Sequence, residues 1–359
     1  MEYKGKQIWS ESPESADEYR RNYVEGINHY ILRQNEVCKR MRSSFMTPEK
    51  LVENPDYFRT IYRDMLGIDT YLKEQVPAAE IVYVGKDEIC DIYRLQTFIT
   101  AEIPFYAMLL IPHGIAKCPL VIAQHGGGGT PELCSDMCGK NNYNHMVQRV
   151  LERGAAVLAP QLLLWATEEI ETMRAHKIPF DRNRSDRNLK RFGGSITGLE
   201  IAGIIRYIDL MNDQTIKADP HYRVLERIDG EHLAMIGLSY GGYFTLHTMA
   251  ADTRIKAGFT SGCFNDRDVY EWSDWVYRDS ALYFQDAEVA ALCAPRKLYI
   301  QVGKVDEVFD WQSALLESER IRQYYEAHQC LENVQFSVWD GGHTVSPDED
   351  GYDFLFSVL

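Results

Sequence analysis

The chain has 359 residues, of which 45% are hydrophobic and 25% are charged, a composition typical of a folded globular protein rather than a disordered one. Its formal net charge of −15 argues against nucleic acids and anionic membranes as partners, because an acidic surface and their phosphates repel each other. No apolar window approaches the roughly 18 residues that span a bilayer. The polar segment 1–7 lacks the apolar core of a signal peptide, so we expect a cytoplasmic protein.

Residues 1–79 are predicted to form an N-terminal helical extension. Apolar side chains recur at helical spacing in its first part, at Tyr19, Tyr23, Ile27 and Tyr30. An apolar helix face has to be covered, and the sequence allows two ways to cover it. The extension either packs on the main domain or forms a homo-oligomer through the N-terminal helices.

Residues 80–359 are predicted to form one α/β domain with a mostly parallel central sheet flanked by helices. Three early runs suit an antiparallel opening of the sheet, and six later apolar runs are separated by helical segments, as right-handed crossovers require. The expected strands are 80–84, 89–100, 105–111, 120–123, 155–159, 233–236, 257–260, 298–302 and 335–339.

A glycine-rich loop follows the expected strand 120–123. It begins at His125 and continues as four glycines, from Gly126 to Gly129. Such a loop can present backbone N–H groups to a developing oxyanion, and Gly127 is the donor that we predict. The alternatives are a plain flexible connection and a phosphate-binding loop, but the chain lacks the flanking residues of known phosphate loops.

Two insertions are expected to shape a substrate site. The first, near residues 165–198, contains several arginines in its 182–191 part, which either bind an acidic group or form a solvated loop with local ion pairs. The second, near residues 262–279, contains Trp272 and Trp275. We predict that these two rings bind substrate, with packing into the core as the alternative.

The segment around Ser239 predicts a catalytic serine. It reads Gly-Leu-Ser-Tyr-Gly-Gly, and it lies where an apolar strand gives way to a helix. Glycines at positions 237 and 241 allow strand and helix to approach closely, so the serine hydroxyl would be exposed on a sharp turn. The backbone N–H of Tyr240 is then the second oxyanion donor that we expect.

A serine hydroxyl needs a base and a carboxylate to become a good nucleophile. Asp306 lies in an acidic turn after the expected strand 298–302, and His343 lies in a glycine-containing loop after the last expected strand. Carboxyl ends of parallel strands meet at one edge of a sheet, so Ser239, Asp306 and His343 are predicted to be neighbours there. Asp306 or one of its acidic neighbours could instead cap the helix that begins near Trp311.

The cysteines give no sign of a cofactor or a disulfide framework. The chain has eight scattered cysteines, which favours reduced thiols. Cys134 and Cys138 have His125 and His145 near them in the sequence, yet no second cysteine pair completes a structural zinc motif. We therefore expect neither a metal nor an organic cofactor.

Together, the motif at Ser239, the residues Asp306 and His343, and the His125-Gly126-Gly127 loop resemble an α/β-hydrolase over roughly the last three-quarters of the chain. Phrases such as Trp-Asp-Gly-Gly-His, ending at His343, are similar to the dienelactone hydrolase and bacterial acetyl xylan esterase-like branch. The resemblance implies an α/β-hydrolase fold with an N-terminal helical extension.

We therefore predict a serine hydrolase that cleaves carboxylic esters through an acyl-enzyme, with a small-molecule or carbohydrate ester as substrate and deacetylation as the first choice. The Gly-Leu-Ser-Tyr-Gly-Gly-Tyr run also resembles prolyl-oligopeptidase-type peptidases, so an exopeptidase or amidase is an alternative. A second alternative is a catalytically silent binding protein with the same fold, in which fluorophosphonates would not label Ser239.

Overall fold

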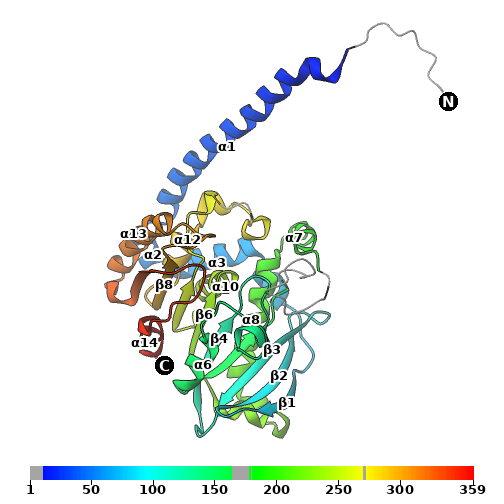
Figure 1. Ribbon diagram of the computed structural model, residues 1–359, viewed down its shortest axis with the longest axis vertical. Helices are drawn as coiled ribbons and strands as arrows, with labels where there is room; N and C mark the ends of the chain where they lie inside the picture. Colours follow the sequence, from blue (N-terminus) through cyan, green and yellow to red (C-terminus); the bar gives the residue numbers. More distant parts are fainter. Residues whose placement is uncertain (1–10, 164–177, 179, 270–271) are drawn as a thin grey trace, which may run out of the picture.

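A mixed nine-stranded sheet forms the centre of the molecule (Figure 1). The structure is a computed structural model that describes residues 11–163, 178, 180–269 and 272–359. Within these residues the strand order is β1-β2-β3-β5-β4-β6-β7-β8-β9. The strands are β1 (Glu80–Lys86), β2 (Cys90–Phe98), β3 (Pro104–Pro112), β4 (Cys118–Gln124), β5 (Ala156–Pro160), β6 (Ile228–Leu238), β7 (Ala257–Ser261), β8 (Lys297–Gly303) and β9 (Val334–Trp339).

The pairing of the strands confirms the predicted architecture. Strands β1, β2 and β3 are antiparallel, and β3 is also antiparallel to β5. From β5 to β9 all neighbouring strands are parallel. Consequently the carboxyl ends of β4, β6, β8 and β9 lie at one edge of the sheet, where catalytic groups of open parallel sheets collect.

Strand β6 begins at Ile228, five residues earlier than the apolar run 233–236 predicted. Its first two residues pair with Cys118 and Pro119 of β4, and the register then shifts before Leu120 pairs with Leu233. Polar residues fill this irregular stretch, so an apolar pattern could not reveal it.

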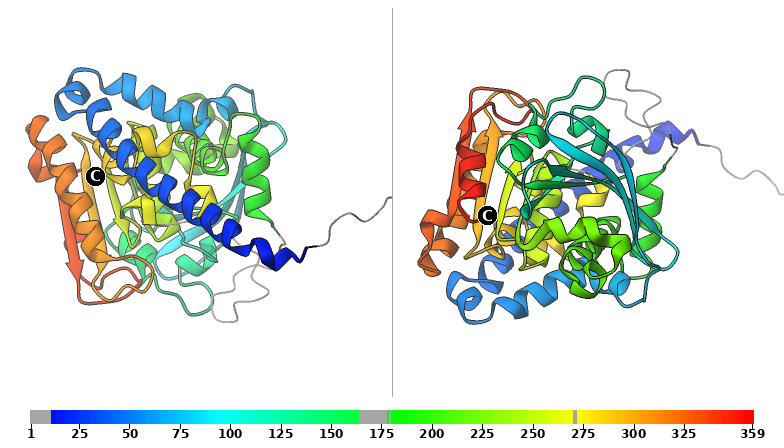
Figure 2. Two further views of the ribbon diagram at one scale, coloured as in Figure 1. Left: turned by 90° about the horizontal axis from the view of Figure 1, so that it is seen from above. Right: turned by 90° about the horizontal axis from the view of Figure 1, so that it is seen from below.

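Helices cover both faces of the sheet (Figure 2). The larger core lies on the face covered by α3, α8, α10, α12 and α13, and the smaller core lies under α5, α6 and α14. The helices are α1 (Asp17–Phe45), α2 (Pro48–Glu53), α3 (Pro55–Leu66), α4 (Ile68–Leu72), α5 (Pro131–Cys134), α6 (Met146–Glu152), α7 (Arg182–Lys190), α8 (Ile196–Asn212), α9 (Gln214–Lys217), α10 (Tyr240–Ala251), α11 (Ser280–Tyr283), α12 (Asp286–Ala291), α13 (Trp311–Ala327) and α14 (Asp350–Phe356).

The N-terminal extension behaves in two different ways. Helices α2 and α3 each start with a proline at their first position, and the Thr47 hydroxyl caps α2. Their buried residues, among them Phe58 and Tyr62, belong to the larger core. Helix α1, in contrast, projects away from the body of the molecule (Figure 1). None of the described helices is long and apolar enough to cross a membrane.

The arginine-rich part of the first insertion is a helix, α7, and not the loop considered from the sequence. The carboxylate of Asp181 accepts a hydrogen bond from the backbone N–H of Arg184 and so caps this helix. Trp165 and most of the first half of the insertion lie outside the described residues.

Candidate active site

Ser239 occupies a strained turn between β6 and α10. Its backbone angles are φ 60° and ψ −123°, a combination that L-residues other than glycine rarely adopt. The turn is possible because of its glycines: a Cβ on Gly237 would lie 2.3 Å from the backbone of Gly241, and one on Gly241 would lie 2.0 Å from the carbonyl oxygen of Gln124. Ser239 itself is half-buried, whereas every residue of α10 is buried. The turn therefore presents its side chain at the carboxyl edge of the sheet.

Asp306 and His343 form a hydrogen-bonded pair at the same edge. The Asp306 Oδ2 and His343 Nδ1 atoms are 2.9 Å apart, and the Asp306 side chain is fully buried. Burial alone would raise the pKa of Asp306, but hydrogen bonds from His343 and from the backbone N–H groups of Val308 and Phe309 hold that pKa below its usual value. The carboxylate is thus kept ionised and aimed at the imidazole.

Asp310, and not Asp306, caps the helix that follows this acidic turn. The Asp310 carboxylate accepts hydrogen bonds from the backbone N–H groups of Gln312 and Ser313, so Asp310 is the N-cap of α13. Asp306 is therefore available to orient His343.

The backbone of Ser239 lies close to the ring of His343. The Ser239 N–H donates to the Ser261 carbonyl at 2.8 Å, and a Cβ on the next residue, Gly262, would lie 3.2 Å from His343 Nδ1. The structure gives a hydrogen bond between His343 and Asp306 but none between the Ser239 hydroxyl and the imidazole. The serine–histidine link of the triad therefore remains a prediction.

The loop of His343 is held by a residue that the sequence did not single out. The Asn142 side chain donates to the His343 carbonyl at 2.8 Å, and the Asn142 carbonyl accepts from the hydroxyl of Thr344 at 2.6 Å. Asn142 precedes His343 by 201 residues, so no local sequence signal could have linked them.

The loop from His125 to Gly129 is anchored from two sides. The backbone N–H of Leu162 donates to Nε2 of His125 at 2.9 Å, which leaves the proton on Nδ1, next to the carbonyl of Gly126. The buried hydroxyl of Tyr143 accepts from the N–H of Gly126 at 2.8 Å. A Cβ on Gly126 would lie 3.2 Å from the Cβ of Ser239, so the loop passes directly beside the serine.

The two predicted oxyanion donors occupy suitable backbone positions. Gly127 is half-buried, while the other three glycines of its loop are buried, and its N–H donates to no described residue. Tyr240 is the first residue of α10, where N–H groups lack acceptors within the helix and the helix dipole is positive. The role of both groups as oxyanion donors stays a prediction.

Aromatic side chains line the region between Tyr240 and His343. Trp272 lies 5.9 Å from Tyr240 and 5.7 Å from Phe309 between ring centroids, and Phe309 stacks 5.8 Å from His343. Trp272 is half-buried, whereas Trp275 is only 4% exposed and stacks on Tyr243 at 4.5 Å. Of the two tryptophans proposed from the sequence, Trp272 has accessible surface. Trp275 is buried in the core and packs against Trp272, with the ring centroids 4.6 Å apart.

A buried ionic cluster supports the first residue of α10. Arg182 binds Glu200 through two hydrogen bonds of 2.9 and 2.8 Å, and Asp274 through a third of 2.7 Å. Asp274 in turn accepts from the hydroxyl of Tyr240 at 3.1 Å. Burial lowers the pKa of Arg182, but the two carboxylates outweigh burial and keep that pKa above its usual value. The charge of Arg182 is therefore neutralised by buried carboxylates of the protein itself. The other arginines of this segment are exposed, namely Arg184, Arg187 and Arg191.

Comparisons with known proteins identify the architecture. No protein-family profile matches the chain, and no curated protein sequence matches it. Solved structures do match: a candidate acetyl xylan esterase from Bacteroides fragilis superposes with a TM-score of 0.63 at 15% identity, covering 88% of this chain and 84% of its own. The chain has an α/β-hydrolase fold.

Two further neighbours share this α/β-hydrolase fold. A glucuronoyl esterase from Solibacter usitatus has a TM-score of 0.58 at 13% identity, and the match covers 87% of this chain and 93% of that one. Acetyl xylan esterase 1 from a Thermoanaerobacterium species has a TM-score of 0.54 at 13% identity, with 86% and 94% covered. At such identities the likeness establishes the fold.

The four residues considered as metal ligands have different contacts in this fold. His125 holds the glycine loop, His145 pairs with Asp136 at 3.1 Å, and Cys134 is buried while Cys138 is exposed. Among the described residues, no three histidine, cysteine or acidic side chains are grouped so that they could hold a metal ion.

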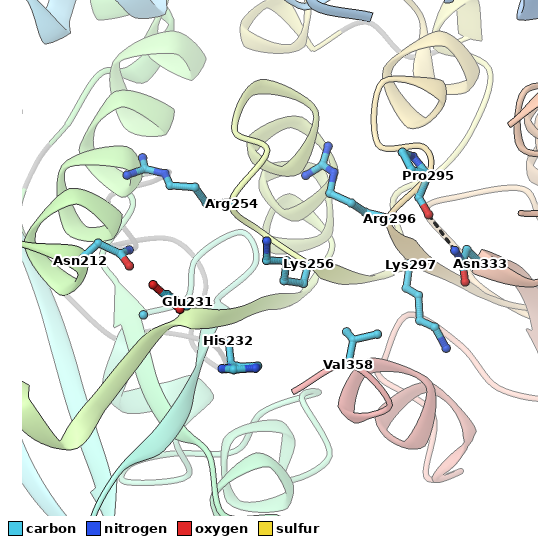
Figure 3. Close-up of a pocket in the computed structure, with 11 residues that line it drawn as sticks. Asn212, Glu231, His232, Arg254, Lys256, Pro295, Arg296, Lys297, Asn333 and Val358 are labelled. Atoms are coloured by element: carbon cyan, nitrogen blue, oxygen red, sulfur yellow. Dashed lines mark hydrogen bonds between the residues drawn. The ribbon is translucent and has the colours of Figure 1, made fainter. Parts of the chain in front are cut away.

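Two cavities lie at opposite ends of the parallel strands. One of about 790 Å³ opens at the amino ends of β6, β7 and β8, away from Ser239 (Figure 3). Its cationic side chains diverge: Arg254 binds Asp252 and Asp209, Arg296 binds backbone carbonyls, and Lys297 binds Ser357. A second, apolar cavity of about 530 Å³ includes Gln161, whose side chain reaches His125 at 3.2 Å. This second cavity therefore adjoins the glycine loop of the candidate active site.

Proposed function

We propose that this protein is a serine hydrolase that cleaves carboxylic esters of carbohydrates or small molecules. The observation that carries the proposal is the contact between the buried Asp306 carboxylate and His343, 2.9 Å apart, next to a serine on a strained turn. A buried carboxylate that accepts from Nδ1 fixes the tautomer of a histidine so that Nε2 can accept a proton. This is the arrangement that a weak serine nucleophile needs.

The proposed reaction proceeds through an acyl-enzyme. His343 Nε2 takes the proton of the Ser239 hydroxyl as Oγ attacks the ester carbonyl, and the N–H groups of Tyr240 and Gly127 stabilise the resulting oxyanion. The imidazolium then gives its proton to the leaving alcohol oxygen as the C–O bond breaks. A water molecule, deprotonated by His343, attacks the acyl-enzyme and releases the acid and Ser239.

The proposed substrate class is a carbohydrate ester, with removal of an acetyl group as the first choice. Solved proteins with the same fold include acetyl xylan esterases and glucuronoyl esterases, which supports a sugar ester without identifying it. The half-buried ring of Trp272 lies beside Tyr240 and offers a flat apolar surface on which a sugar ring can stack. The chemistry needs no cofactor.

The deciding experiment measures hydrolysis by the wild type and by Ser239→Ala. The substrates are p-nitrophenyl esters from acetate to octanoate, acetylated xylo-oligosaccharides, a methyl glucuronate ester and aminoacyl p-nitroanilides. We expect turnover of acetyl esters that the alanine variant loses by roughly 10⁶-fold. Ser43→Ala, at an exposed position near the C-terminal end of α1, is the matched control and should keep full activity.

Two outcomes would redirect the proposal. Preferential cleavage of the anilides would make the protein a peptidase or amidase. Release of methanol from the methyl glucuronate ester without release of acetate would mean that the enzyme cleaves esters of the sugar acid and not acetyl esters. Absence of both turnover and fluorophosphonate labelling of Ser239 would leave only a binding role.

A further inference from the structure

Most of helix α1 is not covered by any described part of its own chain. Of its 29 residues only Arg42 is buried, and that side chain is held by Glu288 and by the carbonyl of Ala281. The last third of the helix, from about Asn35 onward, lies against α11, whereas the first two-thirds project beyond the body (Figure 1). The sequence left two ways to cover the apolar face of this helix, and packing on the main domain accounts only for its C-terminal third.

The projecting part carries a continuous apolar stripe. We use the name α1 stripe for Tyr19, Tyr23, Ile27 and Tyr30, which follow one another at spacings of three or four residues and therefore share one side of the helix. All four are exposed, Tyr19 at 76% and Tyr23 at 72%. Most of a helix's stability in a protein comes from packing of such a face, so an uncovered stripe of this length indicates an absent partner.

The charges along α1 are complementary when a second copy runs in the opposite direction. Described residues from 11 to 25 have a net charge of −3, from Glu11, Glu14, Asp17, Glu18 and Glu25 against Arg20 and Arg21. Residues 33 to 40 have a net charge of +2, from Arg33, Lys39 and Arg40 against Glu36. In an antiparallel pair, the acidic tip of each helix meets the basic part of the other. In a parallel pair, like charges would meet.

The charge of the whole chain also favours this region as the contact. Two copies with a net charge of −15 each repel one another over most of their surfaces. Helix α1 differs, since its own net charge is +2, from six basic and four acidic residues. A two-fold symmetric contact needs a surface that complements itself, and α1 has both the apolar centre and the opposed charges for it.

We infer that α1 is a dimerisation helix: its stripe packs against the α1 stripe of a second copy of this chain, with the two helices antiparallel. This pairing covers the exposed tyrosines of both copies. The dimer does not depend on the proposed hydrolase activity.

The first test measures the mass of the full chain by sedimentation equilibrium from low micromolar to 100 µM protein. We expect a dimer of the 41.4 kDa chain, and we expect Ile27→Asp to weaken the dimer at least 100-fold in Kd. Asn28→Asp adds the same charge on the other side of the helix, because Asn28 is rotated by about 180° from Tyr19 and about 140° from Tyr23, and it should leave the dimer intact. A wild type that stays monomeric at 100 µM, or an Ile27→Asp variant that still dimerises, would overturn the inference.

A second test separates antiparallel from parallel pairing. Glu18→Lys and Arg33→Glu should each weaken the dimer roughly five-fold in Kd, since each reversal replaces an exposed attraction by a repulsion. Combined in one chain they should restore the wild-type Kd, because each new lysine would again face a glutamate of the other copy. In a parallel dimer residue 18 would face residue 18, so the double variant would not be restored.

Discussion

Helices α10 and α1 are the two extremes of this molecule. All twelve residues of α10 are buried, and its N-terminus begins directly after Ser239. Helix α1 has one buried residue in 29, and it runs out from the body. The two helices differ in what surrounds them. Helix α10 packs against β4, β6 and β7, whereas α1 packs mainly against α11.

The difference indicates where accuracy is needed. Catalysis by a strained serine requires its neighbours within tenths of an ångström, which only a fully enclosed element can provide. Association of two copies does not need such accuracy, provided that the α1 stripe stays uncovered until the second copy binds. Substitutions around α10 should therefore have large effects on activity, and comparable substitutions in α1 should have small ones.

After Ser239→Ala, Asp306→Asn should give the largest effect. Loss of the carboxylate would leave His343 in the wrong tautomer, so we expect kcat for an acetyl ester to fall roughly 10⁴-fold, as in enzymes with a Ser-His-Asp triad. The measurement is steady-state hydrolysis of p-nitrophenyl acetate. Asp310→Asn is the matched control, because asparagine caps a helix as well as aspartate does, and its kcat should be unchanged. Equal losses in both variants would contradict the assignment of Asp306.

The same pair predicts a pH dependence of stability. The pKa of Asp306 is lowered in the folded protein, so its ionised form stabilises the fold at every pH above the unfolded value of about 3.9. That contribution is lost as the pH falls through the lowered folded pKa. The difference in unfolding free energy between the wild type and Asp306→Asn should therefore be constant from about pH 5 to 8 and shrink below about pH 4. Urea denaturation across this range measures it, and a difference that grows toward acid pH would have the wrong sign.

Arg182→Met should give the next largest effect. It leaves Glu200 and Asp274 buried without their cation, which typically costs about 3–5 kcal/mol of unfolding free energy. Urea denaturation is the measurement, and Arg184→Met is its control because Arg184 is exposed in the same helix. A loss below 1 kcal/mol in Arg182→Met would mean that the cluster does not support Tyr240.

Gly241→Ala tests the tight contact at the start of α10. The new Cβ would lie 2.0 Å from the carbonyl oxygen of Gln124, so the helix and β4 must separate. We expect a loss of about 1–3 kcal/mol in unfolding free energy and a fall in kcat of roughly 100-fold from displacement of Ser239. Unchanged kcat in a destabilised protein would show that the position of the serine does not depend on this contact.

Gly26→Ala makes the same change in α1 and should have the smallest effect, with the opposite sign. A Cβ on Gly26 meets nothing within 4 Å, so alanine only improves helix propensity. We expect a gain of about 0.5–1 kcal/mol in local helix stability, seen as slower amide exchange in α1, with kcat unchanged. Destabilisation would indicate that Gly26 already lies in a close contact.

The sequence predicted the sheet well, and it placed three candidate site residues directly after strands of that sheet, because both depend on local patterns. Short apolar runs marked each strand, and a strand followed by a glycine-containing turn marked the positions of Ser239, Asp306 and His343. The Asp306–His343 contact follows from strand order alone, since the carboxyl ends of β8 and β9 are adjacent.

The sequence could not predict the residues that support this edge. Tyr143, Asn142 and the Arg182 cluster act across separations of 17 to 201 residues, and each is an ordinary polar residue in its own segment. The arginine-rich segment looked like a solvated loop because its charges alternate, and only the fold brings Glu200 and Asp274 to Arg182. Likewise, helical spacing revealed the apolar face of α1 but not which part of it the body covers.

The order of the edge residues along the chain also matters during synthesis. Ser239 leaves the ribosome roughly one hundred residues before His343, an interval of about 5–20 s at ordinary translation rates. Throughout this time the nascent chain has its nucleophile but neither the completed strand β9 nor the base that follows it. A nascent chain in which His343 has not yet emerged would therefore lack the base of the proposed serine hydrolase.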